Sequence, residues 1–85
     1  MKRGYAVVLR RAAKNSSADC PDLPGCVATG RTLDATLRRM RSAMTMHLEG
    51  LRADKLKVPP PRTRLSALVR RQGDEHVYAV VRVAA

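Results

Sequence analysis

The chain has 85 residues and carries 17 Lys and Arg against 7 Asp and Glu, which gives a formal net charge of +10. This length predicts one domain over residues 1–85. The only aromatic side chains are two Tyr, which disfavours an RNA-binding surface that stacks bases on aromatic rings. No apolar run is long enough for a signal-peptide core or a membrane span, so we expect a soluble, cytoplasmic protein with reduced cysteines.

The first third of the chain predicts three short strands. YAVVLRRA (5–12) alternates apolar residues in the way that is typical of a strand, and NSS (15–17) predicts a turn. A second strand is expected over about 17–20, and CVAT (26–29) predicts a third.

A long amphipathic helix should follow Gly30. Thr32 suits the N-cap and Asp34 the first turn, where a negative charge favours the helix dipole. The helix should run for roughly 18–20 residues, because apolar side chains recur every three or four positions. These residues are Leu33, Leu37, Met40, Met44, Leu48 and Leu51.

The last third begins with a proline-rich connector over 59–63, which the helix cannot enter. RLSALVRR (64–71) is compatible with either a short strand or a helical turn. HVYAVVRVAA (76–85) predicts the last strand. The predicted order is β-β-β-α-β, an α+β fold with one helix packed on a small antiparallel sheet.

One helix covers one face of such a sheet. Ala6 and Val8, together with Tyr78 and Val80, make the opposite face partly apolar as well. A second copy of the chain could cover that face, so we expect a homo-oligomer, a dimer or a tetramer.

The loop PDLPG (21–25) is the most rigid stretch of the sequence. Pro21 and Pro24 fix φ, and Gly25 can adopt a positive φ after the bend. Asp22 and Leu23 would then be presented to a partner. Alternatively, Leu23 caps the end of the core and Asp22 bonds to nearby amides.

Arginines offer a different kind of surface, one that contacts the phosphates of DNA or RNA. An equally open interpretation is a solvated basic surface. The candidates for phosphate contact are Arg38, Arg39, Arg41, Arg70 and Arg71.

Residues for metal binding or catalysis are sparse. Cys20 and Cys26 are separated by five residues, whereas structural zinc sites use closer pairs and four ligands. His47 is expected to pack beside the apolar stripe of the helix, and the seven acids are scattered. We therefore expect no metal, no cofactor and no enzymatic activity.

Several motifs together resemble the HicB-like antitoxins of bacterial toxin–antitoxin systems. They are PDLPGCVATG (21–30), TL (32–33), HLEGL (47–51) and the proline segment, with YAVVL (5–9) and VYAVVRV (77–83) as fitting strands. The resemblance covers nearly the whole chain. It implies a partial RNase H-like fold without the nuclease carboxylates.

The resemblance also implies a function. Such an antitoxin binds a small, RNA-cleaving HicA-like toxin and occludes its active site. Many members carry a C-terminal DNA-binding domain, and a sequence ending at Ala85 suggests a member without one, so operator repression stays open.

The family's helix is usually acidic, whereas this one is rich in arginine. A basic HicA-like toxin would be repelled, so binding would rest on shape and apolar contact or on an acidic toxin. Alternatively, the chain has lost its toxin and binds nucleic acid directly.

Overall fold

The structure is a computed structural model that describes residues 2–84. Each strand and the long helix lie close to the ranges expected from the sequence, and the segment 64–71, which was compatible with a short strand or a helical turn, forms a second helix. The elements in chain order are β1 (Lys2–Arg11), β2 (Ser16–Asp19), β3 (Val27–Gly30), α1 (Leu33–Ala53), α2 (Leu65–Gln72) and β4 (Val77–Ala84).

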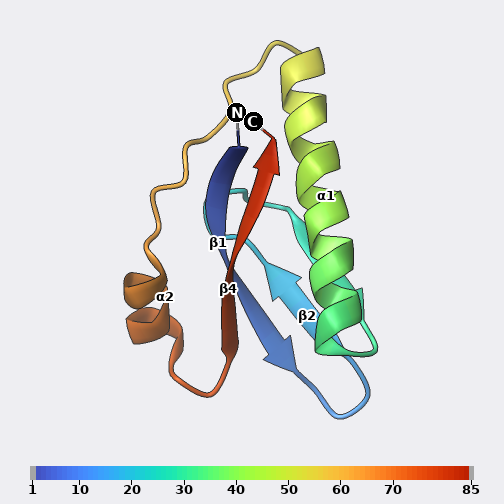
Figure 1. Ribbon diagram of the computed structural model, residues 1–85, viewed down its shortest axis with the longest axis vertical. Helices are drawn as coiled ribbons and strands as arrows, with labels where there is room; N and C mark the ends of the chain where they lie inside the picture. Colours follow the sequence, from blue (N-terminus) through green and yellow to red (C-terminus); the bar gives the residue numbers. More distant parts are fainter. Residues whose placement is uncertain (1, 85) are drawn as a thin grey trace.

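The four strands form one antiparallel sheet with the order β3-β2-β1-β4 (Figure 1). β1 lies in the middle and pairs with both β2 and β4, so β3 and β4 are the edge strands. Because side chains alternate along a strand, Tyr5, Val7 and Leu9 point to one face, and Ala6 and Val8 point to the other. All five are buried, so each face of the sheet has its own cover.

Helix α1 covers the first face, as the sequence predicts. Thr32 is its N-cap, and the Oγ1 atom of Thr32 accepts a hydrogen bond from the amide of Ala35 at 3.1 Å. Met40, Met44 and Leu48 are fully buried in the main core. Burial of each such side chain contributes about 1.5–3 kcal/mol, so the apolar stripe holds the helix in place.

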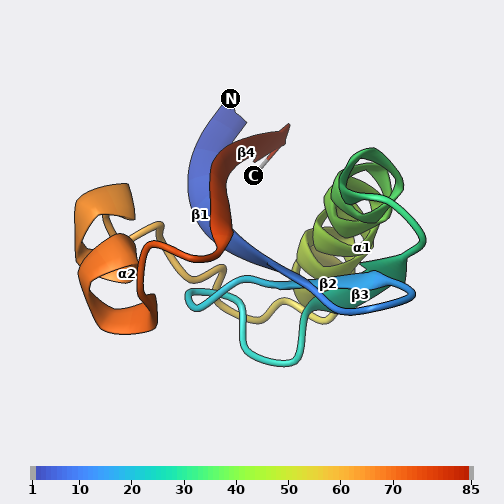
Figure 2. The same ribbon diagram turned by 90° about the horizontal axis from the view of Figure 1, so that it is seen from below.

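Helix α2 covers the second face of the sheet. The predicted β-β-β-α-β order contained a single helix, so α2 is a correction to that order. Figure 2 shows α1 and α2 on opposite sides of the β1–β4 pair. Leu68 is fully buried against Ala6 and Val8, with Leu65 and Tyr78 beside it. The eight residues of α2 are too few for an isolated helix, so its stability depends on this packing.

This second cover removes much of the reason for a homo-oligomer. Ala6 and Val8, whose apolar character suggested a second copy of the chain, are already buried by α2. Val80 stays 53% exposed on the same face. Oligomerisation therefore stays a prediction, with less apolar surface to drive it than the sequence suggested.

The start of α1 is fixed to the sheet by a close approach at Gly30. A Cβ atom on Gly30 would lie 2.8 Å from the backbone nitrogen and from the Oγ1 of Thr36. Only glycine fits there, since real Cβ atoms do not approach so closely.

None of the helices within residues 2–84 is long and apolar enough to cross a membrane.

Candidate functional site

The PDLPG loop is a compact bend between β2 and β3. The amide of Leu23 donates to the carbonyl of Cys20 at 3.1 Å, and the amide of Cys26 donates to the carbonyl of Leu23 at 3.0 Å. Gly25 has a φ of 84°, a conformation that favours glycine. The loop is therefore held by its own backbone as well as by its prolines.

The interior of this loop belongs to the core. Leu23 is 0% exposed and belongs to the same apolar cluster as Met44 and Leu48. The expectation that Leu23 is presented to a partner is wrong, and the alternative, in which it caps the end of the core, is confirmed. Pro24 and Gly25 are the exposed residues of the loop, and Pro21 is half-buried.

Asp22 links the loop to the proline-rich connector. Its carboxylate accepts hydrogen bonds from the amides of Arg62 and Thr63 and from the hydroxyl of Thr63, each at 2.8 Å. The Tyr5 hydroxyl also donates to the carbonyl of Pro59 at 2.6 Å. Asp22 thus bonds to amides, as the second alternative states, but these amides lie 40 and 41 residues further along the chain.

The loop and the connector enclose a shallow cleft of about 430 Å³, which we call the proline groove. The connector had been predicted only as an extended spacer, and its part in this groove was missed. The proline run itself was the available signal, because an extended segment of prolines presents a fixed surface. The groove is lined by Pro21, Asp22, Pro24, Lys57, Pro59, Pro60 and Arg62.

The two cysteines lie at the ends of the loop as buried, free thiols. Burial raises the pKa of Cys20 from 9.0 to about 11, although the backbone amides of Asp22 and Leu23 partly offset this. Burial also raises the pKa of Cys26. Both thiols stay neutral near pH 7 and pack as small apolar groups. Within residues 2–84, no group of three or more His, Cys, Asp or Glu side chains gathers in a way that could hold a metal.

The five candidate arginines do not form one surface. Arg38, Arg39 and Arg41 lie on α1, whereas Arg70 and Arg71 lie on α2, on the other side of the sheet (Figure 2). The two groups therefore do not form one continuous row of cations.

Several arginines of α1 instead bind the edges of the sheet. Arg39 donates to the carbonyl of Thr29 in the edge strand β3 at 3.1 Å. On the other edge, Arg41 donates to the carbonyl of Arg82 at 3.1 Å, and Arg52 donates to the carbonyl of Ala84 at 3.4 Å. Edge carbonyls are the acceptors that an added strand would use. These arginines therefore protect both edges of the sheet.

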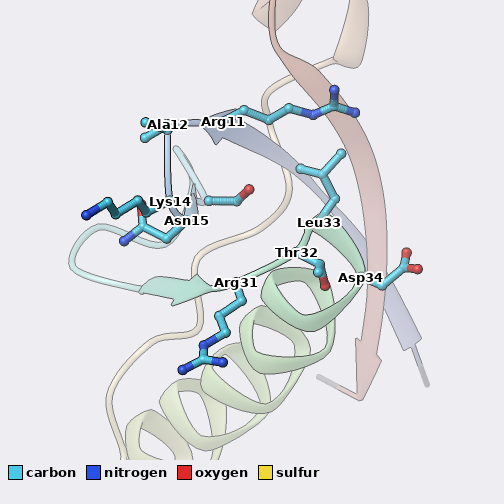
Figure 3. A pocket seen from close by; sticks show the side chains of 10 residues that line it. Arg11, Ala12, Lys14, Asn15, Arg31, Thr32, Leu33 and Asp34 are labelled. Carbon is cyan, nitrogen blue, oxygen red and sulfur yellow. The ribbon is translucent and has the colours of Figure 1, made fainter.

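A second concavity, of about 470 Å³, lies between the β1–β2 turn and the start of α1. Its cationic side chains are Arg11, Lys14 and Arg31, and Asp34 is also part of the lining. Figure 3 shows that these cations point in different directions, away from one another. They do not converge on one position where a phosphate could bind.

Comparison with known proteins gives a consistent result. Residues 5–85 match the family model described as the HicB-like antitoxin of bacterial toxin–antitoxin systems. Among curated proteins, the chain is 27% identical over 55 residues to an uncharacterized 14.9 kDa protein from the rep–hol intergenic region of Haemophilus phage HP1. That match covers 65% of this chain and 41% of the phage protein, so the chain matches less than half of its curated relative.

Solved structures show the same fold. The N-terminal domain of the Burkholderia pseudomallei antitoxin HicB is 23% identical, with a TM-score of 0.83 and full coverage of both chains. The larger structure of that antitoxin is 22% identical, with a TM-score of 0.82, over 92% of this chain and 61% of that one. A chain of the HicA3 and HicB3 toxin–antitoxin complex is 19% identical, with a TM-score of 0.73 and 95% coverage of each.

Proposed function

The chain belongs to the family of HicB-like antitoxins of bacterial toxin–antitoxin systems, and from this premise we propose that it binds and neutralises a small HicA-like, RNA-cleaving toxin. The observation that carries the proposal is the family match over residues 5–85. A further support is that a similar structure, with a TM-score of 0.73, comes from a complex of HicA3 with HicB3. We propose that the chain acts by occupying the toxin's surface and has no enzymatic activity of its own.

The proline groove and the exposed side of the PDLPG loop are our candidate for the contact surface. Pro21, Asp22, Pro24 and Gly25 contribute from the loop, and Leu23 contributes from below by anchoring the loop in the core. The backbone bonds of the loop and the three hydrogen bonds of Asp22 fix this surface before binding. A surface that is already ordered loses little conformational entropy in a complex, and this increases affinity.

The test uses the small protein encoded beside this chain. Its RNA cleavage should stop when a stoichiometric amount of this chain is added, and the two proteins should elute together in size-exclusion chromatography. An Arg70→Gln/Arg71→Gln variant is the control, because it changes exposed residues of α2 outside the proline groove and should still stop the cleavage. Unchanged RNA cleavage together with separate elution would refute the antitoxin function.

The alternative is direct binding of DNA or RNA, which the net charge of +10 favours. The division of the arginines between α1 and α2 and the engagement of Arg39 and Arg41 with edge carbonyls weigh against it. Binding of a 20-base-pair duplex that weakens steeply between 50 and 200 mM salt would support this alternative.

A further inference from the structure

We infer that the proline groove binds an acidic segment of a protein partner in which an aromatic side chain lies next to a carboxylate. The inference rests on the proposed function, because the toxin is the partner in question. It specifies which chemical features that toxin presents, and where.

The walls of the groove suit an aromatic ring. Four prolines from two separate segments line it: Pro21 and Pro24 from the loop, and Pro59 and Pro60 from the connector. Proline has no amide N–H, so these walls are apolar and rigid. Aromatic side chains pack well against extended proline segments, as in the recognition of proline-rich peptides. A volume of about 430 Å³ accommodates one large side chain with part of its neighbour.

The rim of the groove suits a carboxylate. Lys57 and Arg62 line it, and both are exposed. The one acid in the groove, Asp22, already accepts three hydrogen bonds from Arg62 and Thr63. The lining of the groove therefore carries two cations and one carboxylate, and that carboxylate already accepts hydrogen bonds. The local charge is positive, and a net charge of +10 over the chain strengthens the attraction of an anionic partner.

A nucleic acid fits the same groove poorly. Phosphates need several N–H donors, and the proline nitrogens supply none. The arginines of α2 are not among the residues that line the groove. The observations thus favour a protein segment as the occupant.

The first experiment measures binding of the adjacent-gene protein, in a catalytically inactive form, by isothermal titration calorimetry. The groove variant Lys57→Gln/Arg62→Gln should raise Kd at least tenfold, because both rim charges are lost. The matched control Arg70→Gln/Arg71→Gln changes the net charge by the same amount on α2 and should change Kd less than threefold. Neutral replacements keep the Asp22 contact intact, since the backbone amide of Arg62, not its side chain, makes that bond. An equal effect in both variants, or none in the groove variant, would overturn the inference and leave the antitoxin function standing.

The second experiment does not depend on the toxin. The acetylated, amidated peptide Glu-Asp-Phe-Asp-Glu is titrated into the labelled chain, and amide shifts are followed by NMR. The peptide should shift the amides of Gly25, Lys57 and Arg62, whereas peptides with Ala for Phe or with Lys for the acids should bind at least fivefold more weakly. If the peptide binds and the toxin does not, the groove chemistry is supported and the antitoxin function fails. No shift with the peptide, or shifts of the same amides by a duplex RNA alone, would overturn the inference.

Discussion

Replacement of Asp22 by alanine tests how the candidate surface is held together. The variant removes three hydrogen bonds of 2.8 Å between the loop and the connector. A hydrogen bond to a charged group contributes about 1.5–3 kcal/mol when buried, and these are half-buried or exposed, so about 1 kcal/mol each is a fair value. We expect the free energy of unfolding to fall by about 2–4 kcal/mol, a large part of the 5–15 kcal/mol that is typical of a domain.

Urea denaturation measures this change, and amide hydrogen exchange locates it. The amides of Arg62 and Thr63 should exchange much faster in Asp22→Ala, because their acceptor is gone. Asp22→Asn keeps the shape and still accepts from amides, so its loss should be smaller, about 1 kcal/mol. Asp74→Ala, in the exposed turn before β4, is the matched control. A change below about 0.5 kcal/mol in Asp22→Ala, with unchanged exchange at Thr63, would refute the linking role of Asp22.

Three further variants test other parts of the fold. Leu23→Ala should lower the free energy of unfolding by about 2–5 kcal/mol because a fully buried leucine is removed; a loss below 1 kcal/mol by urea denaturation would contradict the burial. Burial raises the pKa of Cys20 from 9.0 to about 11, so the neutral thiol's contribution to stability is fully present below pH 9 and declines as the pH rises to 11. The difference in urea midpoint between wild type and Cys20→Ala should shrink over that window, and a constant difference would contradict the shift. Arg41→Ala/Arg52→Ala should increase self-association in light scattering, since two edge carbonyls of β4 lose their donors; Arg38→Ala is the control, and equal association in both would contradict edge protection.

The helix α1 could be predicted from the sequence because its determinants are local. A three-to-four spacing of Leu and Met, a threonine N-cap and a following proline run are all read within one segment. The structure places Leu33–Ala53 in one continuous helix with Met40, Met44 and Leu48 buried. The first and last strands followed from alternation in the same way, and the order of all four strands along the chain was correct.

Helix α2 could not be decided from the sequence, because eight residues carry too little periodicity. Leu65 and Leu68 are three apart, which suits one side of a helix, but a short strand remained equally compatible. The choice between a helix and a strand depends on the apolar surface of Ala6 and Val8, which lies about 60 residues away in the sequence. The need to bury that surface favours the helix, and the same need had suggested a second copy of the chain.

The sequence identified the PDLPG loop as a candidate site, and this role stays a prediction, but the sequence did not reveal how the loop is held in place. The PDLPG stretch was identified from its prolines. The hydrogen bonds that the Asp22 carboxylate accepts come from Thr63 and from the amide of Arg62, and no spacing rule connects these residues to Asp22. The groove likewise needs two segments that are distant in sequence. Long-range pairings of this kind depend on how the connector returns across the sheet, and a single sequence carries no direct signal for that path.

The distribution of positive charge bears on the choice between a protein and a nucleic acid as partner. A net charge of +10 alone favours nucleic acid, but the effect of an arginine depends on what its guanidinium already binds. Arg39 and Arg41 donate to edge carbonyls, Arg10 pairs with Asp19 and with Gln72, and helix α2, which carries Arg70 and Arg71, lies on the other side of the β1–β4 pair from α1. Several arginines thus already bind other groups of the chain, and Lys57 and Arg62 are the cations that line the proline groove. A phosphate backbone needs a continuous row of cations, whereas a single carboxylate needs one or two beside an apolar contact, and the proline groove provides the second arrangement.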